Sequence, residues 1–237
     1  MAESESRVGV VFVSHSDKIA DGLVELARQM APNARLIAAG GTDEGSIGTS
    51  FEKVSAGISS ADTGAGVVVL CDLGSAILTA ETARDFLDEA DRDRVVIVDA
   101  PLVEGGVAAA VAAESGENLA AVIAAAQSAN SVQAAPVQPA SGQTRGQQDG
   151  ASAGYTRTVT LINADGLHAR PAADFVKLAT TFPVRVTVNG KDAKSLLGIM
   201  ALGLTRGKAV EISTVDEEGK PAVDALAALI ESGFGEA

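Results

Sequence analysis

A 28-residue segment in the middle of the chain lacks the large apolar side chains that dominate a hydrophobic core. Residues 127–154 read QSANSVQAAPVQPASGQTRGQQDGASAG and include no Leu, Ile, Phe, Met, Tyr or Trp. Such a composition cannot bury enough apolar surface to offset the entropy of ordering the chain, and it is typical of a flexible linker. The sequence therefore predicts two domains, residues 1–126 and 155–237. A coil of this length has a root-mean-square span of about 30 Å.

The net charge, the length of the apolar runs and the number of cysteines exclude several classes of protein. Lys and Arg number 18 against 31 Asp and Glu, a net charge of −13 at pH 7, so a nucleic-acid binder is not expected. No run approaches the roughly 18 apolar residues of a membrane span, and residues 1–6 are acidic where a signal peptide is basic. We therefore expect a cytoplasmic protein without membrane contact. The single cysteine, Cys71, excludes an internal disulfide and a cysteine-based metal cluster, and its apolar setting favours a core role.

The first domain alternates short apolar runs with segments of helical periodicity. This alternation indicates an α/β fold, a mostly parallel sheet with helices on both faces. The expected strands are 8–13, 36–39, 67–71 and 95–98, and the expected helices are 17–31, about 50–60, 75–90 and 105–126.

The second domain has a different order of elements. The pattern βαββαβα, with a strong hairpin signal at Asn189-Gly190, favours an α+β open-faced sandwich, an antiparallel sheet with helices on one face. The expected strands include 158–162, 184–188 and 209–215, and the expected helices are 168–181, 195–202 and 220–232.

His15 lies directly after the first strand, and Asp72 holds the equivalent place after the strand 67–71. Because ligands of open α/β sheets bind beyond the carboxyl ends of the strands, we expect the two side chains to meet there. A carboxylate bound to one imidazole nitrogen fixes the tautomer and leaves the other nitrogen as a nucleophile. The small-residue turn 73–76 offers main-chain N–H groups for an anion. The alternatives are a structural histidine and an aspartate that caps a helix.

His168 lies between a strand and a helix, in the segment DGLHARPA (165–172). Proline is favoured in the first turn of a helix, so the helix begins at or near His168. A phosphorylated imidazole there faces unpaired N–H groups, and Arg170 supplies a positive charge for phosphate oxygens. The alternative is a surface histidine beside a solvated arginine.

Three segments of the first domain resemble one family. VVFVSHSDKIADGLVELARQM (10–30), DLGSAILTAETA (72–83) and APLVEGGVAAAV (100–111) are similar to the mannose-type enzyme IIA of the phosphotransferase system. More narrowly, they resemble phosphoryl-donor subunits of phosphoenolpyruvate-dependent dihydroxyacetone kinases. The resemblance implies that His15 carries a phosphoryl group, that Asp72 orients it, and that the chain forms a homodimer through this domain.

The second domain resembles the histidine phosphocarrier HPr over residues 155–232, with GLHARPA as its active-site signature. The resemblance implies that enzyme I phosphorylates His168 and that Arg170 stabilises the product. Ser195 matches a position that some bacteria phosphorylate for regulation; the alternative is an N-cap of the short helix. Leu196, Leu197, Ile199 and Met200 cannot all face inward on one short helix, so part of this patch is expected to dock partners.

Together, the two resemblances imply a phosphohistidine relay. Phosphate passes from enzyme I to His168, then to His15, and then to ADP on a separate dihydroxyacetone kinase subunit. The sequence has no P-loop and no metal-ligand cluster, so neither a metal nor a cofactor is expected. Two alternatives stay open: a fusion that feeds a mannose-type sugar transporter, and a regulatory module whose phosphorylation is read by a partner.

Overall fold

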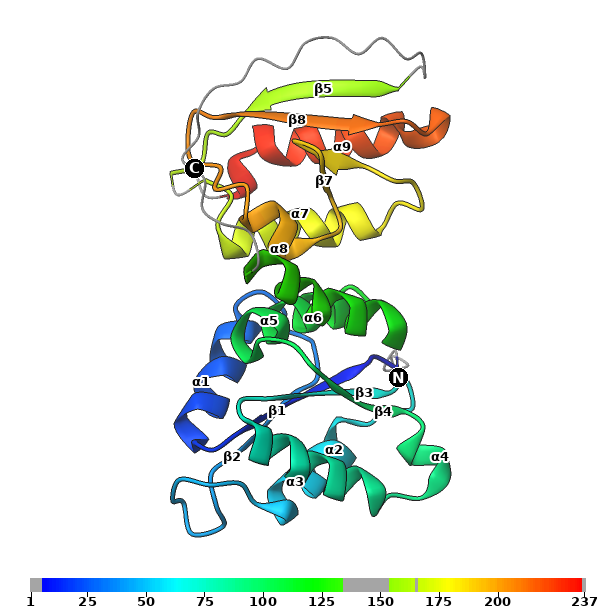
Figure 1. Cartoon of the computed structure of the whole chain (residues 1–237). Helices are drawn as coiled ribbons and strands as arrows, with labels where there is room; N and C mark the ends of the chain where they lie inside the picture. Colours follow the sequence, from blue (N-terminus) through cyan, green and yellow to red (C-terminus); the bar gives the residue numbers. More distant parts are fainter. Residues whose placement is uncertain (1–5, 134–153, 165, 236–237) are drawn as a thin grey trace. The chain divides into compact units, whose positions relative to one another are not determined.

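The computed structural model describes residues 6–133, 154–164 and 166–235 (Figure 1). The chain divides into two compact units after Asn130. No helix in the described ranges combines the length and the apolar character needed to cross a bilayer.

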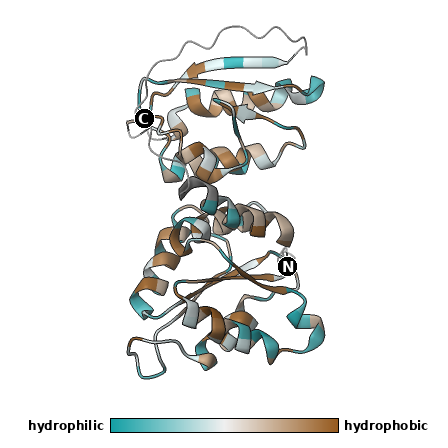
Figure 2. Ribbon diagram, viewed as in Figure 1, coloured by the Kyte–Doolittle hydropathy of each residue, from teal (hydrophilic) through white to brown (hydrophobic). Residues whose placement is uncertain are grey.

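The first unit is built on a four-stranded parallel sheet in the order β2-β1-β3-β4. Its strands are β1 (Gly9–Ser14), β2 (Leu36–Gly40), β3 (Val67–Cys71) and β4 (Val95–Val98). All six residues of β1 are buried, since helices cover both faces of the sheet. This double burial explains why the strands read as continuous apolar runs, which colour brown in Figure 2.

Helices enclose the sheet from both sides, as the alternating pattern predicts (Figure 1). One face is covered by α1 (Asp17–Arg28), α5 (Leu102–Glu114) and α6 (Leu119–Gln133). The other is covered by α2 (Phe51–Ala61) and α3 (Gly74–Asp85), and the short α4 (Glu89–Arg92) follows α3.

The two long helices predicted in this domain are each divided. The segment 75–90 forms α3 and α4, and the segment that follows β4 forms α5 and α6. The second break has a clear cause. Gly116 adopts a left-handed φ of 77°, and the N–H of Glu117 reaches back to the carbonyl of Ala112 at 3.2 Å, a turn that ends a helix.

The predicted linker begins too early at residue 127, because α6 continues to Gln133. Ala129 is 1% exposed, and the side chain of Asn130 donates to a main-chain carbonyl after β4. The small side chain of Ala129 is enough to pack the last turns of α6 against the core. The absence of large apolar residues therefore does not mark the end of the domain. The rest of the predicted linker, residues 134–153, lies outside the described residues.

The second unit holds an antiparallel sheet in the order β5-β8-β6-β7. Its strands are β5 (Tyr155–Thr160), β6 (Thr187–Val188), β7 (Lys191–Asp192) and β8 (Ala209–Thr214). One face carries α7 (Ala169–Thr180), α8 (Leu196–Met200) and α9 (Lys220–Glu231) (Figure 1).

The hairpin of this sheet lies where the sequence predicts it. Asn189 and Gly190 both adopt positive φ, 46° and 79°, as a type I′ turn requires. The strand that enters the turn is shorter than the predicted 184–188. The fold class of both domains is confirmed.

Replacement of Gly9 should destabilise the first domain. A Cβ on Gly9 would lie 2.3 Å from the main-chain oxygen of Ala61, at the end of α2. We expect Gly9→Ala to lower the free energy of unfolding by about 1–3 kcal/mol. Gly22 on α1 has no atom within 4 Å of its Cβ position, so Gly22→Ala should raise it by about 0.5–1 kcal/mol. Urea unfolding of both variants measures the difference, and equal midpoints would contradict the packing described.

Candidate functional site

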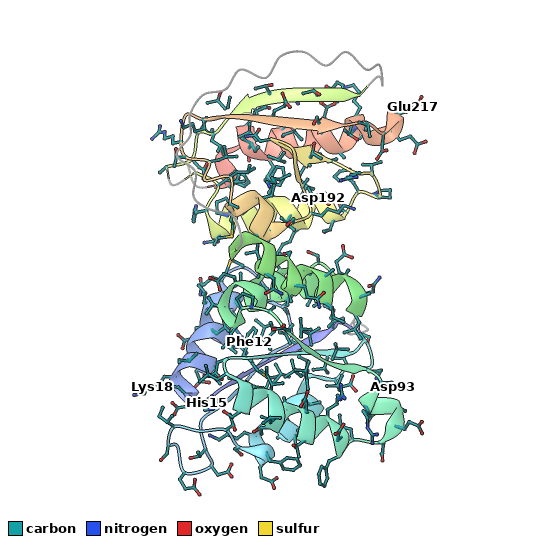
Figure 3. All side chains as sticks on the ribbon, viewed as in Figure 1. Phe12, His15, Lys18, Asp93, Asp192 and Glu217 are labelled. Atoms are coloured by element: carbon teal, nitrogen blue, oxygen red, sulfur yellow. The ribbon has the colours of Figure 1, made fainter. Side chains whose placement is uncertain are left out.

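The carboxyl ends of β1 and β3 bring two predicted site residues together. β1 and β3 are neighbouring parallel strands, and the main-chain N–H of Asp72 continues their pairing by donating to Val13 at 3.2 Å. His15 follows β1 and is 20% exposed. Figure 3 places it at the edge of the first unit, across the domain from Asp93. The expected meeting of His15 and Asp72 is therefore present.

Four donors converge on the carboxylate of Asp72. Its Oδ1 lies 2.9 Å from Nδ1 of His15 and 2.7 Å from the N–H of Leu73. Its Oδ2 lies 2.9 Å from the hydroxyl of Ser14 and 2.8 Å from the N–H of His15. The alternative of a helix cap is not realised, because the N-cap of α3 is Leu73. Asp72 instead holds both the main chain and the ring of His15.

These hydrogen bonds keep Asp72 ionised. Burial alone raises the pKa of this carboxyl, but the bonds from the main chain and ring of His15, from Ser14 and from Leu73 outweigh burial. The pKa of Asp72 is held below its ordinary value of 3.8. An ionised carboxylate only accepts hydrogen bonds, so the proton between the two side chains belongs to Nδ1 of His15.

The second ring nitrogen of His15 faces the start of α3. Its Nε2 lies 2.7 Å from the hydroxyl of Ser75, which donates to the nitrogen lone pair when Nδ1 carries the proton. The N–H groups of Gly74 and Ser75 belong to the first helical turn and have no carbonyl within the helix to bond. A phosphoryl group on Nε2 would therefore meet N–H donors and the positive end of the α3 dipole.

Sequence reasoning did not single out Ser75 or Ser14 as functional. Ser75 belongs to the turn 73–76, which was predicted to offer main-chain N–H groups only. The sequence did offer one signal for Ser75, because its hydroxyl lies one residue inside the start of the helix. Ser14 is fully buried, and a buried hydroxyl at the end of an apolar strand needs a partner, which is Asp72.

The Gly-rich loop between β2 and α2 supports the main chain of His15. The N–H of Gly48 donates to the carbonyl of His15 at 2.9 Å. Lys53 from α2 fixes the base of this loop, because its Nζ donates to the carbonyls of Gly40 at 3.0 Å and Thr42 at 2.7 Å. His15 is thus held by two other segments of the chain, residues 72–75 and the Gly-rich loop.

Cys71 is partly buried and packs against the core. Burial, reinforced by the charges of Asp72 and Glu81, raises the pKa of its thiol to about 12, so it is not a thiolate nucleophile near neutral pH. Within the described ranges, no group of three or more His, Cys, Asp or Glu side chains is placed to hold a metal ion.

His168 is the N-cap residue of α7, where the sequence predicts the helix to begin. Its ring is exposed, and Nδ1 lies 3.2 Å from the carbonyl of Gly166. Gly166 adopts a φ of 71°, and a Cβ there would lie 2.3 Å from the main-chain oxygen of Leu204. Only glycine satisfies both conditions, so this residue fixes the loop that presents His168.

Arg170 lies in the first turn of α7 and is exposed. It shares that turn with His168, and no hydrogen bond joins the two described side chains. Both residues lie at the end of the helix where main-chain N–H groups have no helical partner.

Ser195 is the N-cap of α8, and its hydroxyl accepts the N–H of Gly198 at 3.1 Å. The alternative role as a cap is therefore present, and regulatory phosphorylation stays a prediction. Of the apolar residues expected not to face inward together, only Met200 is left accessible, and docking at this helix stays a prediction. Leu196, Leu197 and Ile199 are at most 6% exposed, because α8 packs against α7 on one side and β7 on the other. Met200 is partly exposed.

Loss of the Ser14 hydroxyl should raise the pKa of the Asp72 carboxyl. We expect the carboxyl of Asp72 to titrate below 3.8 in the wild type and at a higher pH in Ser14→Ala, which lacks one donor. A depressed pKa stabilises the fold above the unfolded-state pKa, and that stability is lost as the pH falls through the folded-state pKa. The stability gap between wild type and Asp72→Asn should therefore narrow in acid. Carbon NMR of the carboxyl groups checks this, and a wild-type midpoint above 3.8 would contradict it.

Comparison with known proteins gives matches to both halves of the chain. The family model described as "PTS system fructose IIA component" matches residues 9–123, and "PTS HPr component phosphorylation site" matches residues 155–232. The HPr of Vibrio cholerae is 44% identical over 32% of this chain and 95% of its own length.

Two curated relatives are phosphoryl donor subunits, DhaM, of PEP-dependent dihydroxyacetone kinases. The subunit of Providencia stuartii is 32% identical over 97% of this chain, and this chain spans about half of its length (50%). The subunit of kinase 2 of Listeria innocua is 41% identical over 44% of this chain and 84% of its own length. With that coverage, and with the histidine and carboxylate joined at the strand ends, the chain belongs to the family of phosphoryl donor subunits of PEP-dependent dihydroxyacetone kinases.

Proposed function

We propose that the chain is a phosphohistidine relay. Phosphate passes from enzyme I to His168, from His168 to His15, and from His15 to ADP on a separate dihydroxyacetone kinase subunit. The observation that carries the proposal is the ring of His15, whose Nδ1 is bound by Asp72 while Nε2 faces Ser75 and the start of α3. The names of the relatives supply the kinase and the phosphoenolpyruvate origin of the phosphate.

The transfer to His15 is an in-line displacement between two imidazoles. The lone pair of Nε2 attacks phosphorus, and the bond between phosphorus and the donor nitrogen of His168 breaks, returning that electron pair to the donor ring. The positive charge that develops on the ring of His15 lies beside the ionised Asp72, at 2.9 Å. Positioning and charge stabilisation account for catalysis of such a step.

His168 and Arg170 serve the first step. The exposed ring at the N-cap of α7 lets a donor approach in line. The guanidinium of Arg170 and the first-turn N–H groups then stabilise the phosphoryl oxygens.

Exposed apolar side chains surround His15. Leu73 follows Asp72, Ile47 precedes the glycine that binds the carbonyl of His15, and Leu78 lies one turn beyond Ser75. They are exposed to 62, 76 and 64%. Such side chains form the desolvated centre of protein interfaces. They favour the docking of a transfer partner over the histidine, with the acidic surroundings attracting a cationic face.

The segment between the domains acts as a tether in this proposal. A flexible linker gives the two histidines an effective concentration of order millimolar if it spans the sites. Transfer then proceeds within one chain, or between the chains of a homodimer.

Loss of either histidine should interrupt the relay at a defined point. With enzyme I and phosphoenolpyruvate, His15→Ala should retain acid-labile phosphate on His168, whereas His168→Ala should lose label from both sites. Separate HPr should restore label on His15 in the second variant. Mass spectrometry of the two active-site peptides distinguishes these outcomes. Phosphate on His15 of His168→Ala without any added carrier would contradict the proposed order.

The final acceptor is tested with the same phosphorylated protein. The ADP-loaded kinase subunit should discharge His15 and support continued formation of triose phosphate. Discharge only by a membrane-coupled transporter subunit would assign the chain to sugar uptake, and discharge by neither would leave a regulatory module.

Removal of the Ser75 hydroxyl should slow transfer at His15 without disturbing the fold. Ser75→Ala deletes a donor to Nε2 and to the phosphoryl oxygens, so the single-turnover rate should fall by about tenfold, the effect of a hydrogen bond to a charged group. Ser75→Thr keeps the hydroxyl and should retain most of the rate. Ser59→Ala, on the exposed face of α2, is the control. An unchanged rate in Ser75→Ala would reduce Ser75 to a surface residue.

A further inference from the structure

A basic hollow lies at the amino end of the first domain's sheet, the end opposite His15. It encloses about 390 Å³, within the range of small-molecule sites. Residues from the start of β1, the end of α1, the segment that enters β2 and the loop after α2 line it. They are Arg7, Arg28, Asn33, Ala34, Arg35, Leu36, Ile37 and Thr63.

Three cations line this hollow in a strongly acidic domain. Residues 1–126 contain 8 Lys and Arg against 20 Asp and Glu, so most cations have acidic residues available as partners. Yet within the described parts of the chain, no carboxylate oxygen lies within 4 Å of the guanidinium groups of Arg28 and Arg35. Like charges gathered at one hollow repel each other unless an anion joins them.

One carboxylate that contacts residues of the hollow, Glu114, is already engaged. Glu114 accepts the main-chain N–H of Asn33 at 2.8 Å and its side-chain amide at 2.9 Å, and it lies 3.9 Å from Arg7. Arg35 uses its Nε on the carbonyl of Ser60, which fixes the guanidinium and leaves its two terminal nitrogens for another acceptor. A dipole interaction with the end of α1 explains Arg28, but it does not explain why a second arginine, Arg35, lines the same hollow.

We propose that this hollow binds a small organic phosphate ester. A planar guanidinium matches the oxygens of a phosphate group in a two-pronged contact, and Arg28 and Arg35 offer two such groups. The side chains of Ala34 and Ile37 give the short carbon portion of the ester an apolar wall. The site is distinct from His15, since it lies at the amino ends of β1 and β2 and the histidine lies beyond the carboxyl end of β1. α1 joins the two regions, from Asp17 near His15 to Arg28.

Titration calorimetry and amide NMR of the full chain test the site, with glycerol 3-phosphate and inorganic phosphate as separate probes. Glycerol 3-phosphate should bind more tightly and shift the amide signals of residues 33–37. Arg28→Gln and Arg35→Gln should each weaken binding by about tenfold, the contribution of a charge-assisted hydrogen bond. Arg84→Gln, on α3 away from the hollow, should bind as the wild type does. All four proteins should keep phosphoryl transfer at His15.

Three outcomes would overturn the proposal. Equal binding of both probes would mean that a bare anion is recognised and not an ester. Equal weakening in Arg84→Gln would mean that general charge is responsible. No binding of glycerol 3-phosphate to the wild type would mean that the hollow is not a ligand site.

Discussion

The carboxylate of Asp72 is the interaction on which the first site depends. Four donors meet its two oxygens, and they come from the ends of two neighbouring parallel strands. Burial disfavours a charge at this position, so the four bonds are the reason that the charge persists. The same bonds fix the main chain of His15 and the tautomer of its ring. A single carboxylate thereby sets which ring nitrogen carries the proton and which one faces Ser75.

The two histidines are presented in different ways for related chemistry. The carboxylate of Asp72 and the Gly-rich loop hold His15, and the buried hydroxyl of Ser14 holds Asp72. The second ring nitrogen of His15 faces the start of α3. His168 has no carboxylate partner among the described residues and caps α7 behind a glycine that tolerates no side chain. In both sites a helix start offers N–H groups to a phosphoryl group. A rigid acceptor and an exposed donor suit the proposed relay, in which the two histidines exchange one phosphate and release it again.

Much of this arrangement is readable in the sequence because it rests on local patterns. Continuous apolar runs gave the strands of the parallel sheet, and their ends gave His15 and Asp72 as neighbours. Pro171 gave the start of α7, and Asn189-Gly190 gave the hairpin. The features that the sequence did not predict depend on packing between helices and strands. Ser14 and Ser75 acquire roles only once β1 and β3 are paired, α6 extends past the apolar residues because Ala129 fits the core, and Leu196, Leu197 and Ile199 are buried by α7 and β7. Small or short side chains carry no periodic signal for such contacts.

The position of phosphorus on the ring of His15 tests the central claim most directly. Protein labelled with ¹⁵N at histidine and phosphorylated through enzyme I can be examined by NMR that correlates phosphorus with the ring nitrogens. Because Nδ1 donates its proton in a hydrogen bond to Asp72, we predict a phosphorus–nitrogen coupling at Nε2 of His15, with Nδ1 still protonated. Phosphorus on Nδ1 of His15 would contradict it, because that nitrogen could not accept phosphate while bound to Asp72.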